Sequence, residues 1–372
     1  MLSNIISCVL IGLDGEIVNV ETDISNGLPS FSIVGLPDTT VRESKERIRA
    51  AIKNSGFNFP IKRLTINLAP ANTKKEGTHL DLPMAVGLLS ASNQISNKDL
   101  SEYVFIGELS LNGKLNKVIG VLPIVISLRE KGYRKIILPI DNYNEASIIE
   151  DIEVYPFENL AEVIDFFRGE FNIQKKINTK NENQKHRIYN MDFSEVSGQQ
   201  GVKRAMEIAA AGGHNILLIG PPGSGKTMLA RRFPTILPDM DIEESIEVTK
   251  IYSISGLLPS NKGLIKVRPF IAPHHTTSKV SLIGGGKTPK PGDVSLAHLG
   301  VLFLDELTEF QKNHLEVLRQ PMEDEKVTIS RVNATVTYPS KFILVASMNP
   351  CPCVSKMKNY HIFDLEENIA LA

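Results

Sequence analysis

The sequence feature that most constrains the fold is a glycine-rich octapeptide between a predicted strand and a predicted helix. It matches the pattern G-x-x-x-x-G-K-[ST] in full and consists of Gly220, Pro221, Pro222, Gly223, Ser224, Gly225, Lys226 and Thr227. The largely apolar run 215–219 precedes it, and residues 228–233 have a helix-forming composition. A strand, a glycine loop and a helix N-terminus in this order predict an α/β domain that binds a nucleoside triphosphate.

The residue types in this loop suit the chemistry of phosphate binding. The glycines let backbone N–H groups face the β-phosphate, and the helix N-terminus adds partial positive charge. Lys226 would reach the β- and γ-phosphates, and the Thr227 hydroxyl would hold Mg²⁺. A glycine-rich turn without a ligand is the alternative, but it leaves the flanking strand and helix unexplained. We therefore expect ATP and Mg²⁺ as ligands.

Two further predicted strands end in polar residues that suit the same site. Residues 301–304 are apolar and run into Asp305 and Glu306, as a buried parallel strand does where it opens onto a ligand crevice. Asp305 would hold the water shell of Mg²⁺, and Glu306 would polarise the attacking water. Strand 342–348 ends at Asn349, which suits a group that senses the γ-phosphate. The alternative for 301–306 is a core strand that ends in two solvated acids. Together the three strand ends predict a P-loop ATPase of the AAA+ type.

Composition sets limits on the rest of the chain. Its 372 residues and 42% hydrophobic content predict two domains with ordinary cores. The formal net charge of −1 means that any nucleic-acid contact must be a local patch. Neither a signal-peptide pattern nor an 18-residue apolar run occurs, so we expect a cytoplasmic protein that does not span a membrane. Three cysteines do not form a disulfide framework.

The chain divides at a polar stretch, 171–190, which is rich in Lys, Asn and Gln and is predicted to be a linker. The first domain is expected to cover 1–170. Its predicted elements are a hairpin 7–11/16–20, a strand 30–34, a helix 39–55, a strand 63–69, a helix 82–91, a strand 103–106 and a hairpin 107–115 with Asn112-Gly113 at its turn.

Longer motifs carry a resemblance to a known family. The second domain contains "SLIGGGKTPKPGDVSLAHLGVLFLDELTEF", "LRQPMEDEKVTISR" and "MNPCPC". The first contains "FSIVGLPDTTVRESKERIRAAIKNSGFNFP", "LTINLAPANTKKEGTHLDLPMAVGLLSA" and "GELSLNGKL". These motifs closely resemble the Mg-chelatase-like AAA+ proteins of the ComM (YifB) subfamily, up to about residue 354.

The resemblance implies an α/β architecture in two parts. A Lon-protease-like (ribosomal-protein-type) α+β domain would be followed by a P-loop AAA+ αβα domain over 191–354. Proteins of this type are associated with competence and DNA recombination, as ring-forming, hexameric motors that migrate DNA branches. The alternative is a metal-insertion or assembly chaperone, as in the magnesium chelatases. The Lon-like domain favours the motor, because chelatase ATPase subunits lack it.

The first domain lacks the residues of a Lon-type Ser/Lys dyad. Residues 75–77 (Lys-Glu-Gly) lead into Thr78 rather than into a segment with a serine, and 119–123 offer no lysine. No residue near Thr78 in the sequence has the character of its base. His79 and Asp81 are expected to cap or hydrogen-bond a helix N-terminus. We therefore predict a non-proteolytic, structural or partner-binding domain.

Two segments of the second domain are predicted to project from it. Residues 281–292 are expected to form a loop, and 326–338 a β-hairpin about 332–333. In ring ATPases of the related group, insertions at these places point into the central pore. The basic residues that could then meet DNA phosphates are Lys287, Lys290 and Arg331; otherwise they are solvated loop charges. The adjacent histidines His274 and His275 are expected to form a solvated or phosphate-side turn, because neighbours rarely share one face as metal ligands do.

The resemblance stops near Cys351 and Cys353. The family continues with further cysteines, a segment bearing an arginine finger and a helical lid, whereas 355–372 form a divergent tail. Two thiols cannot complete a four-thiolate zinc site within one chain. We expect a C-terminally truncated or split protein that lacks the lid, binds ATP better than it hydrolyses it and does not form a stable ring. It would then be an ATP-binding remnant, unless Arg319 or Arg331 serves as the finger.

Overall fold

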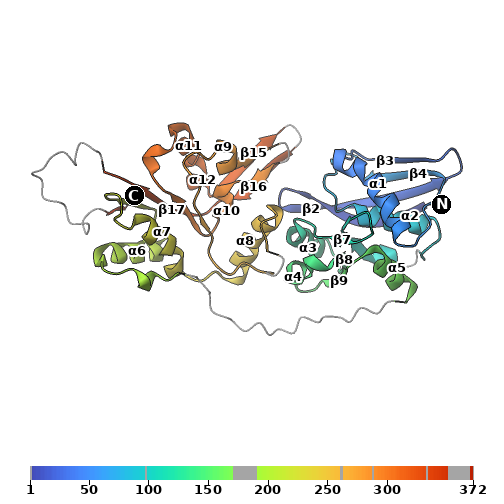
Figure 1. The fold of residues 1–372 in the computed structure, drawn as a ribbon, viewed down its shortest axis with the longest axis horizontal. Helices are drawn as coiled ribbons and strands as arrows, with labels where there is room; N and C mark the ends of the chain where they lie inside the picture. The colour runs from blue at the N-terminus through green and yellow to red at the C-terminus, as the bar shows by residue number, and fades with distance from the viewer. Residues whose placement is uncertain are drawn as a thin grey trace, which may run out of the picture. The chain divides into compact units, whose positions relative to one another are not determined.

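The computed structural model describes residues 2–96, 99–170, 191–259, 263–286, 289–331, 334–350 and 369–371 (Figure 1). The chain forms two compact units. The first contains Met1–Asn181 together with Ser253–Leu264, and the second contains Glu182–Tyr252 and Ile265–Ala372. The predicted linker 171–190 lies outside the described residues. None of the described residues belongs to a helix long and apolar enough to cross a membrane.

The first unit is built on a seven-stranded mixed sheet. Its spatial order is β3 (Ser30–Val34), β4 (Arg63–Ala69), β2 (Asp14–Ser25), β1 (Leu2–Ile11), β5 (Tyr103–Phe105), β8 (Lys135–Pro139) and β9 (Glu153–Phe157). β1 and β2 form the predicted hairpin, which is longer than expected: its antiparallel register runs from Leu2↔Asp23 to Ile11↔Asp14. The predicted strands 30–34 and 63–69 are confirmed as β3 and β4, which pair in parallel.

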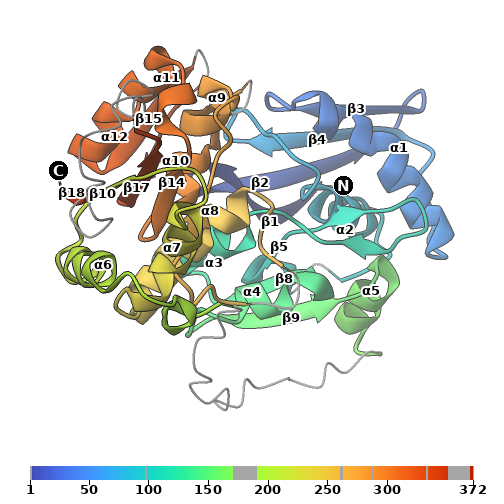
Figure 2. The same cartoon turned by 60° about the vertical axis from the view of Figure 1, so that its left-hand side comes forward.

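Helices cover this sheet where their apolar stripes can be buried. They are α1 (Thr39–Asn54), α2 (Asp81–Ala91), α3 (Val121–Glu130), α4 (Tyr143–Ala146) and α5 (Leu160–Arg168). α1 begins where the Asp38 side chain accepts a hydrogen bond from the Val41 N–H, and its buried stripe includes Val41, Ile48 and Ile52. α2 is buried on all sides; it packs beside α1 and across β1 and β2 (Figures 1 and 2).

Connections complete the first unit. They are the one-turn helices η1 (Leu100–Glu102) and η2 (Ile140–Asn142) and the small hairpin of β6 (Glu108–Leu109) and β7 (Leu115–Asn116). The side chain of Asn112 accepts hydrogen bonds from the Ser110 hydroxyl and from the Lys114 N–H. This arrangement confirms the predicted turn at Asn112-Gly113.

A segment from the second half of the sequence belongs to the first unit. Ser253 donates a hydrogen bond of 2.5 Å to the buried Glu145, and the Lys117 ammonium donates to the Leu258 carbonyl at 2.9 Å. Leu258 is itself buried. The chain therefore returns to the first unit at Ser253 and Leu258, although both follow the phosphate loop in the sequence.

The second unit has a parallel sheet of the P-loop type. Its order is β11 (Phe270–Ile271), β14 (Val301–Leu304), β17 (Ile343–Met348), β10 (Ile216–Ile219) and β18 (Ile369–Leu371). The first four strands run parallel, and β18 pairs antiparallel with β10. The predicted strands 215–219, 301–304 and 342–348 are confirmed as neighbours in this sheet.

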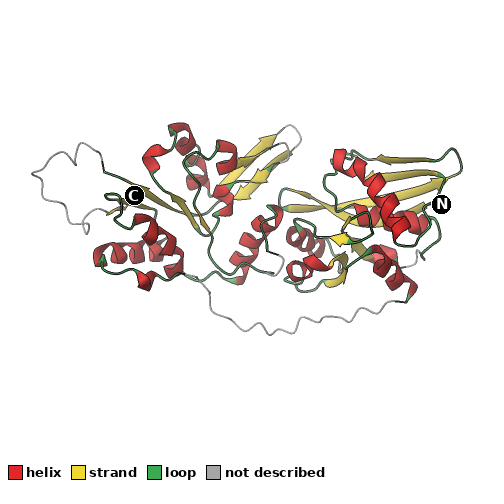
Figure 3. Cartoon of the chain, in the orientation of Figure 1, coloured by secondary structure: helices red, strands yellow, loops and turns green. Residues whose placement is uncertain are grey.

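The second unit also contains helices and short turns (Figure 3). They are η3 (Phe193–Glu195), α6 (Gln200–Gly212), α7 (Lys226–Arg232), η4 (Phe233–Ile236), α8 (Ile242–Ile254), α9 (Lys279–Ile283), α10 (Asp293–Leu296), η5 (Leu307–Glu309), α11 (Lys312–Glu316) and α12 (Arg319–Asp324). Met206, Phe233 and Phe303 lie in the buried apolar cluster between helices and sheet. This core holds the strand that precedes the phosphate loop.

The two predicted projections are regular structure and lie against each other. The segment expected to be a loop contains part of α9 and a small antiparallel pair, β12 (Gly284–Gly285) with β13 (Lys290–Pro291). The prediction of a loop without regular structure over 281–292 was therefore wrong. The glycines let the two short strands approach closely, because a Cβ on Gly292 would lie 2.3 Å from the Gly284 nitrogen. The predicted hairpin is confirmed as β15 (Lys326–Arg331) and β16 (Ala334–Pro339). The Tyr338 hydroxyl donates to the Pro289 carbonyl at 3.0 Å.

Candidate functional site

The candidate site lies at the carboxyl edge of the second unit's sheet. β10 pairs in parallel with β17 up to Ile219↔Met348, and β17 pairs in parallel with β14 up to Leu304↔Ala346. The residues that follow these three strands therefore emerge at the same edge, as they do in α/β folds that bind ligands there. They are Gly220, Asp305 and Asn349, and each begins or belongs to a predicted part of the site.

The glycine loop connects β10 to α7. Gly223 and Gly225 adopt φ angles of +80° and +87°, a region that side chains other than glycine rarely enter. The Ser224 N–H donates to the Pro221 carbonyl at 3.3 Å, which closes the turn before the helix starts at Lys226. The loop that the sequence predicted is thus present, with its glycines at the positions that need them.

Lys226 joins two of the strand ends. Its ammonium donates to the carbonyl oxygens of Gly220 and Pro221 at 2.7 and 3.0 Å, and to Asn349 Oδ1 at 3.2 Å. The lysine and the asparagine are 123 positions apart in the chain. The structure therefore brings together the predicted phosphate-binding cation and the predicted γ-phosphate sensor.

Thr227 and Asp305 form the oxygen-rich part of the site. The Thr227 hydroxyl donates to Asp305 Oδ2 at 2.9 Å. A hydroxyl and a single carboxylate fit Mg²⁺, which prefers oxygen ligands and usually retains waters and substrate phosphates in its shell. Among the described residues, no group of three or more His, Cys, Asp or Glu side chains forms a metal site. A hydroxyl and one carboxylate match the few protein oxygens that such an ion needs.

Glu306 has an unusual backbone for a residue other than glycine. Its φ and ψ are +52° and +54°, and its side chain is exposed. Its N–H donates to Asp305 Oδ1 at 3.1 Å and to Ser347 Oγ at 3.3 Å. Backbone strain of this kind persists where surrounding contacts fix it, and it occurs often at functional sites.

Sequence reasoning missed two residues of this site. Ser347 is buried within β17, and its hydroxyl donates to Asp305 Oδ1. Gln199 precedes α6, and its Nε2 donates to the Ser224 carbonyl at 3.0 Å. The sequence offered for Ser347 a hydroxyl in an otherwise apolar strand, but its place level with Asp305 depends on the strand register, which the sequence does not show. Gln199 carried no comparable signal, because it precedes the loop by more than twenty residues.

The two adjacent histidines lie in a turn, as the sequence predicted, and His274 is exposed there. The rings of His274 and His275 have centroids 4.1 Å apart and planes tilted by 35°, so the two side chains lie close together. His275 also meets the ring of Phe310 edge-on at 6.4 Å. The His274 Nδ1 atom pairs with the Thr276 hydroxyl at 2.9 Å. The described residues around them supply no third metal ligand.

The predicted DNA-contacting residues are only partly described. Lys290 is exposed in β13, on the projection that contacts β16. Lys287 lies outside the described residues, as do the side chain of Arg331 and both Cys351 and Cys353. The other candidate finger, Arg319, is exposed and forms an ion pair with Glu323 at 2.9 Å.

The first unit contains a polar cluster that the sequence did not predict. The Thr78 hydroxyl donates to Glu108, and Asn116 Nδ2 donates to the other carboxylate oxygen of Glu108 at 3.1 Å. β6 brings the Glu108 carboxylate to Thr78 from thirty residues away, a neighbour that the residues adjacent to Thr78 in the sequence do not show. The expected capping of α2 is wrong: no side chain caps it, and the buried Asp81 accepts from Arg47 at 2.8 Å.

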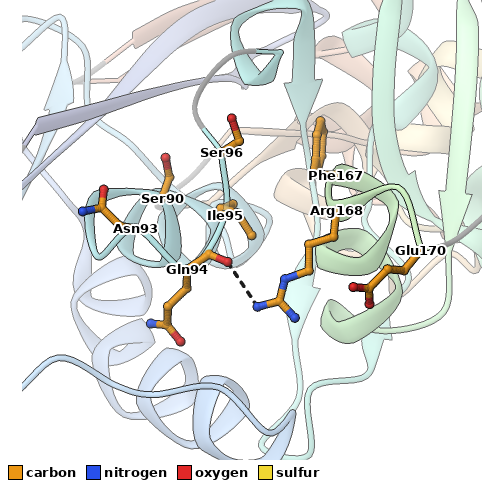
Figure 4. A pocket seen from close by; sticks show the side chains of 8 residues that line it. All are labelled: Ser90, Asn93, Gln94, Ile95, Ser96, Phe167, Arg168 and Glu170. Atoms are coloured by element: carbon orange, nitrogen blue, oxygen red, sulfur yellow. Dashed lines mark hydrogen bonds between the residues drawn. The ribbon is translucent and has the colours of Figure 1, made fainter.

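A polar pocket of about 580 Å³ lies elsewhere in the first unit, where α2 and α5 end (Figure 4). It is lined by Ser90, Asn93, Gln94, Ile95, Ser96, Phe167, Arg168 and Glu170. The Arg168 guanidinium donates to the Gln94 carbonyl at 3.1 Å and lies over the ring of Phe57. None of the predicted site residues lines this pocket, and its arginine is already engaged.

Two family descriptions match the chain. The family described as "Magnesium chelatase, subunit ChlI" matches residues 192–368, and "Subunit ChlI of Mg-chelatase" matches residues 20–142. The second match carries the chelatase name on the first unit. The chelatase name therefore stands on descriptions that match parts of both units.

Individual relatives cover most of the chain. The chain is 44% identical over 349 residues to the competence protein ComM of Haemophilus influenzae. This alignment covers 92% of this chain and 67% of the relative. It is 45% identical over 342 residues to the uncharacterized protein YifB of Escherichia coli, with 92% and 67% covered. The magnesium-chelatase 38 kDa subunit of Rhodobacter capsulatus is 25% identical over 175 residues, which is 42% of this chain and 50% of that subunit.

Proposed function

Because this chain belongs to the Mg-chelatase-like family, in the subfamily of ComM and YifB, we propose that it binds Mg-ATP through the second unit and acts as a component of a DNA-remodelling motor. The observation that carries the ATP-binding part is the convergence of Lys226, Thr227, Asp305 and Asn349 at one edge of a parallel sheet. Their donors and acceptors suit a triphosphate with its magnesium ion.

Each residue of the site has a distinct role in this proposal. The backbone of the glycine loop cradles the β-phosphate, and the Lys226 ammonium moves from the loop carbonyls and Asn349 onto phosphate oxygens. Thr227 and Asp305 hold Mg²⁺, which supplies positive charge against the β- and γ-phosphate oxygens. Asn349 is left beside the γ-phosphate, while the exposed Glu306 orients and polarises the attacking water.

The Lys226→Ala variant tests the binding part of the proposal. It removes the positive charge that meets the phosphates, so a fluorescent ATP analogue should no longer bind measurably. Lys312→Ala is the matched control, because Lys312 is an exposed lysine of the same unit in α11. Unchanged affinity in Lys226→Ala contradicts the assignment.

The DNA part of the proposal has two supports. One is the exposed Lys290 on a projection that packs against the β15–β16 hairpin. The other is the relative named a competence protein. Changing Lys287, Lys290 and Arg331 together to Ala should leave basal ATP turnover intact and flatten the salt dependence of DNA binding, because fewer counterions are released. An unchanged salt slope would show that these are ordinary solvated charges.

A chelatase-like assembly chaperone is the second candidate. It is favoured by the chelatase description of both family matches, although the chelatase subunit itself is only 25% identical over part of the chain. Stimulated ATP turnover separates the two: branched DNA should raise the rate of a motor, and a porphyrin-binding protein should raise that of a chaperone. Little turnover with either would favour an ATP-binding protein without strong hydrolysis.

A further inference from the structure

We infer that Ser347 is a positioning residue of the nucleotide site, which holds Asp305 in place for Mg²⁺ and fixes the backbone turn that presents Glu306. The inference rests on the proposed function, because a positioning role needs an occupied Mg-ATP site. Ser347 lies in neither the phosphate loop nor the acidic strand end, so the inference adds a residue to the proposed site. Three features of the structure carry it.

The first feature is the register of the parallel strands. Ala346 of β17 lies opposite Leu304 of β14, so the next residue, Ser347, is level with Asp305. Ser347 is 1% exposed, and its hydroxyl donates to Asp305 Oδ1. A buried hydroxyl costs free energy unless it is hydrogen-bonded, and this one is bonded to the carboxylate that the site depends on.

The second feature is how the carboxylate of Asp305 is divided between two hydroxyls. Its Oδ2 accepts from Thr227 on α7, and its Oδ1 accepts from Ser347 on β17. Contacts from two different elements fix the rotation of the carboxylate group about its own axis. When Thr227 turns toward a magnesium ion, the bond from Ser347 still holds the orientation of Asp305. Such outer partners of metal-binding carboxylates typically govern metal affinity.

The third feature is the strained residue that follows Asp305. Glu306 has a φ of +52°, and its N–H is shared between Asp305 Oδ1 and Ser347 Oγ. The Ser347 hydroxyl therefore donates to one residue of the turn and accepts from the next. This pair of bonds stabilises a backbone conformation that is unfavourable for glutamate by itself. Without it, both the Asp305 carboxylate and the Glu306 side chain lose a defined position.

A second buried serine nearby allows the positioning role of Ser347 to be distinguished from the packing of a serine in the core. Ser340 lies just before β17 and is also 1% exposed, yet its hydroxyl has no hydrogen-bond partner among the described residues. The two serines share burial and residue type, and they differ in the link to Asp305. Ser340→Ala is therefore the matched control for the loss of a buried serine hydroxyl.

The test uses an isosteric pair of variants, Ser347→Thr and Ser347→Val, in the full chain. Threonine keeps the hydroxyl and valine removes it at nearly the same volume, and both are favourable in a strand. Affinity for a fluorescent ATP analogue is measured with Mg²⁺ and with EDTA. We expect Ser347→Thr and Ser340→Ala to resemble the wild type. In Ser347→Val, the affinity for the ATP analogue measured with Mg²⁺ should fall about tenfold, while the affinity measured with EDTA should not change.

The outcomes separate the inference from the proposed function. If the wild type does not bind the ATP analogue, the proposed function itself fails. If the wild type shows Mg²⁺-dependent binding and Ser347→Val keeps all of it, the positioning role is overturned while the proposed function stands. Ser347→Ala repeats the deletion with a smaller side chain, so that a valine variant that fails to fold does not end the test. Thermal melting of each variant identifies the folded ones.

Discussion

Each unit of this chain contains a threonine hydroxyl bonded to a carboxylate, and the pair in the second unit is surrounded by the rest of the proposed nucleotide site. In the second unit, Thr227 meets Asp305 beside a glycine loop and a lysine at the carboxyl edge of a parallel sheet. In the first unit, Thr78 meets Glu108, whose other oxygen is held by Asn116. The same pair of functional groups therefore has different surroundings in the two units, and we infer a different role for it in each.

The difference lies in what a lysine of each unit contacts. Among the described residues, Lys226 donates to oxygen acceptors at the rim of its loop, and in our proposal it exchanges them for phosphate oxygens. In the first unit, the fully buried Lys75 donates to the carbonyls of Pro70 and Thr73 and has a structural role. A hydroxyl–carboxylate pair predicts phosphate chemistry when a mobile cation and free backbone N–H groups accompany it. Without them it is a structural network.

The largest expected effect concerns the structural network of the first unit. Asp81 is fully buried and is paired with Arg47 at 2.8 and 3.1 Å. Arg47→Ala leaves a buried carboxylate without its partner, which should lower the free energy of unfolding of this unit by about 3–5 kcal/mol. ATP-analogue affinity should not change. Denaturant unfolding measures the first effect, and adding Asp81→Asn should restore part of the loss. Full stability in Arg47→Ala would show that the pair contributes little.

The second prediction concerns pH. Burial lowers the pKa of His79 to about 4, so the folded chain keeps this side chain neutral. The unfolded chain takes up the proton as pH falls through about 6.5, while the folded chain does so only near 4. The stability that is present above pH 6.5 is therefore lost between about 6.5 and 4, by about 3 kcal/mol.

The contribution of His79 is isolated by a variant. Denaturant unfolding of the wild type and of His79→Gln is followed from pH 7 to pH 4, so that carboxylates common to both cancel in the difference. We expect the wild type to lose more stability than the variant over this range. Parallel pH profiles for the two proteins would contradict a neutral, buried His79.

The smallest expected effect is in the second unit. Gln199 Nε2 donates to the Ser224 carbonyl within the phosphate loop. Gln199→Ala removes one hydrogen bond that orders the loop, which should weaken ATP-analogue binding about two- to tenfold with little change in stability. The neighbouring Gln200→Ala is the control, because Gln200 is exposed at the start of α6. Equal affinities for the two variants would remove Gln199 from the site.

The sequence predicted those features whose pattern lies in a few consecutive residues. The phosphate loop and the strand ends at Asp305 and Asn349 were found because a motif or an apolar run precedes each of them directly. Strands β3 and β4 were found with correct bounds from their alternation and turn residues. These elements carry their own pattern, and tertiary packing did not override it.

The residues that were missed depend on pairing between distant segments. Ser347 faces Asp305 only because β17 and β14 pair in one particular register. Glu108 reaches Thr78 because β6 packs beside α2, at whose start Thr78 lies. Residues 253–264 join the first unit although they lie between two elements of the second. No local periodicity encodes such contacts, so single-sequence reasoning had no means of predicting them.

The most direct measurement compares the two hydroxyl–carboxylate pairs in one assay. Asp305→Asn and Glu108→Gln each change one carboxylate to an amide of similar shape, and the affinity for a fluorescent ATP analogue is measured with Mg²⁺ and with EDTA. We predict that Asp305→Asn loses the Mg²⁺-dependent part of the affinity, because an amide holds the ion weakly, and that Glu108→Gln matches the wild type. Equal Mg²⁺-dependent binding in wild type and Asp305→Asn, or its loss in Glu108→Gln, would contradict the assignment of the nucleotide site to the second unit.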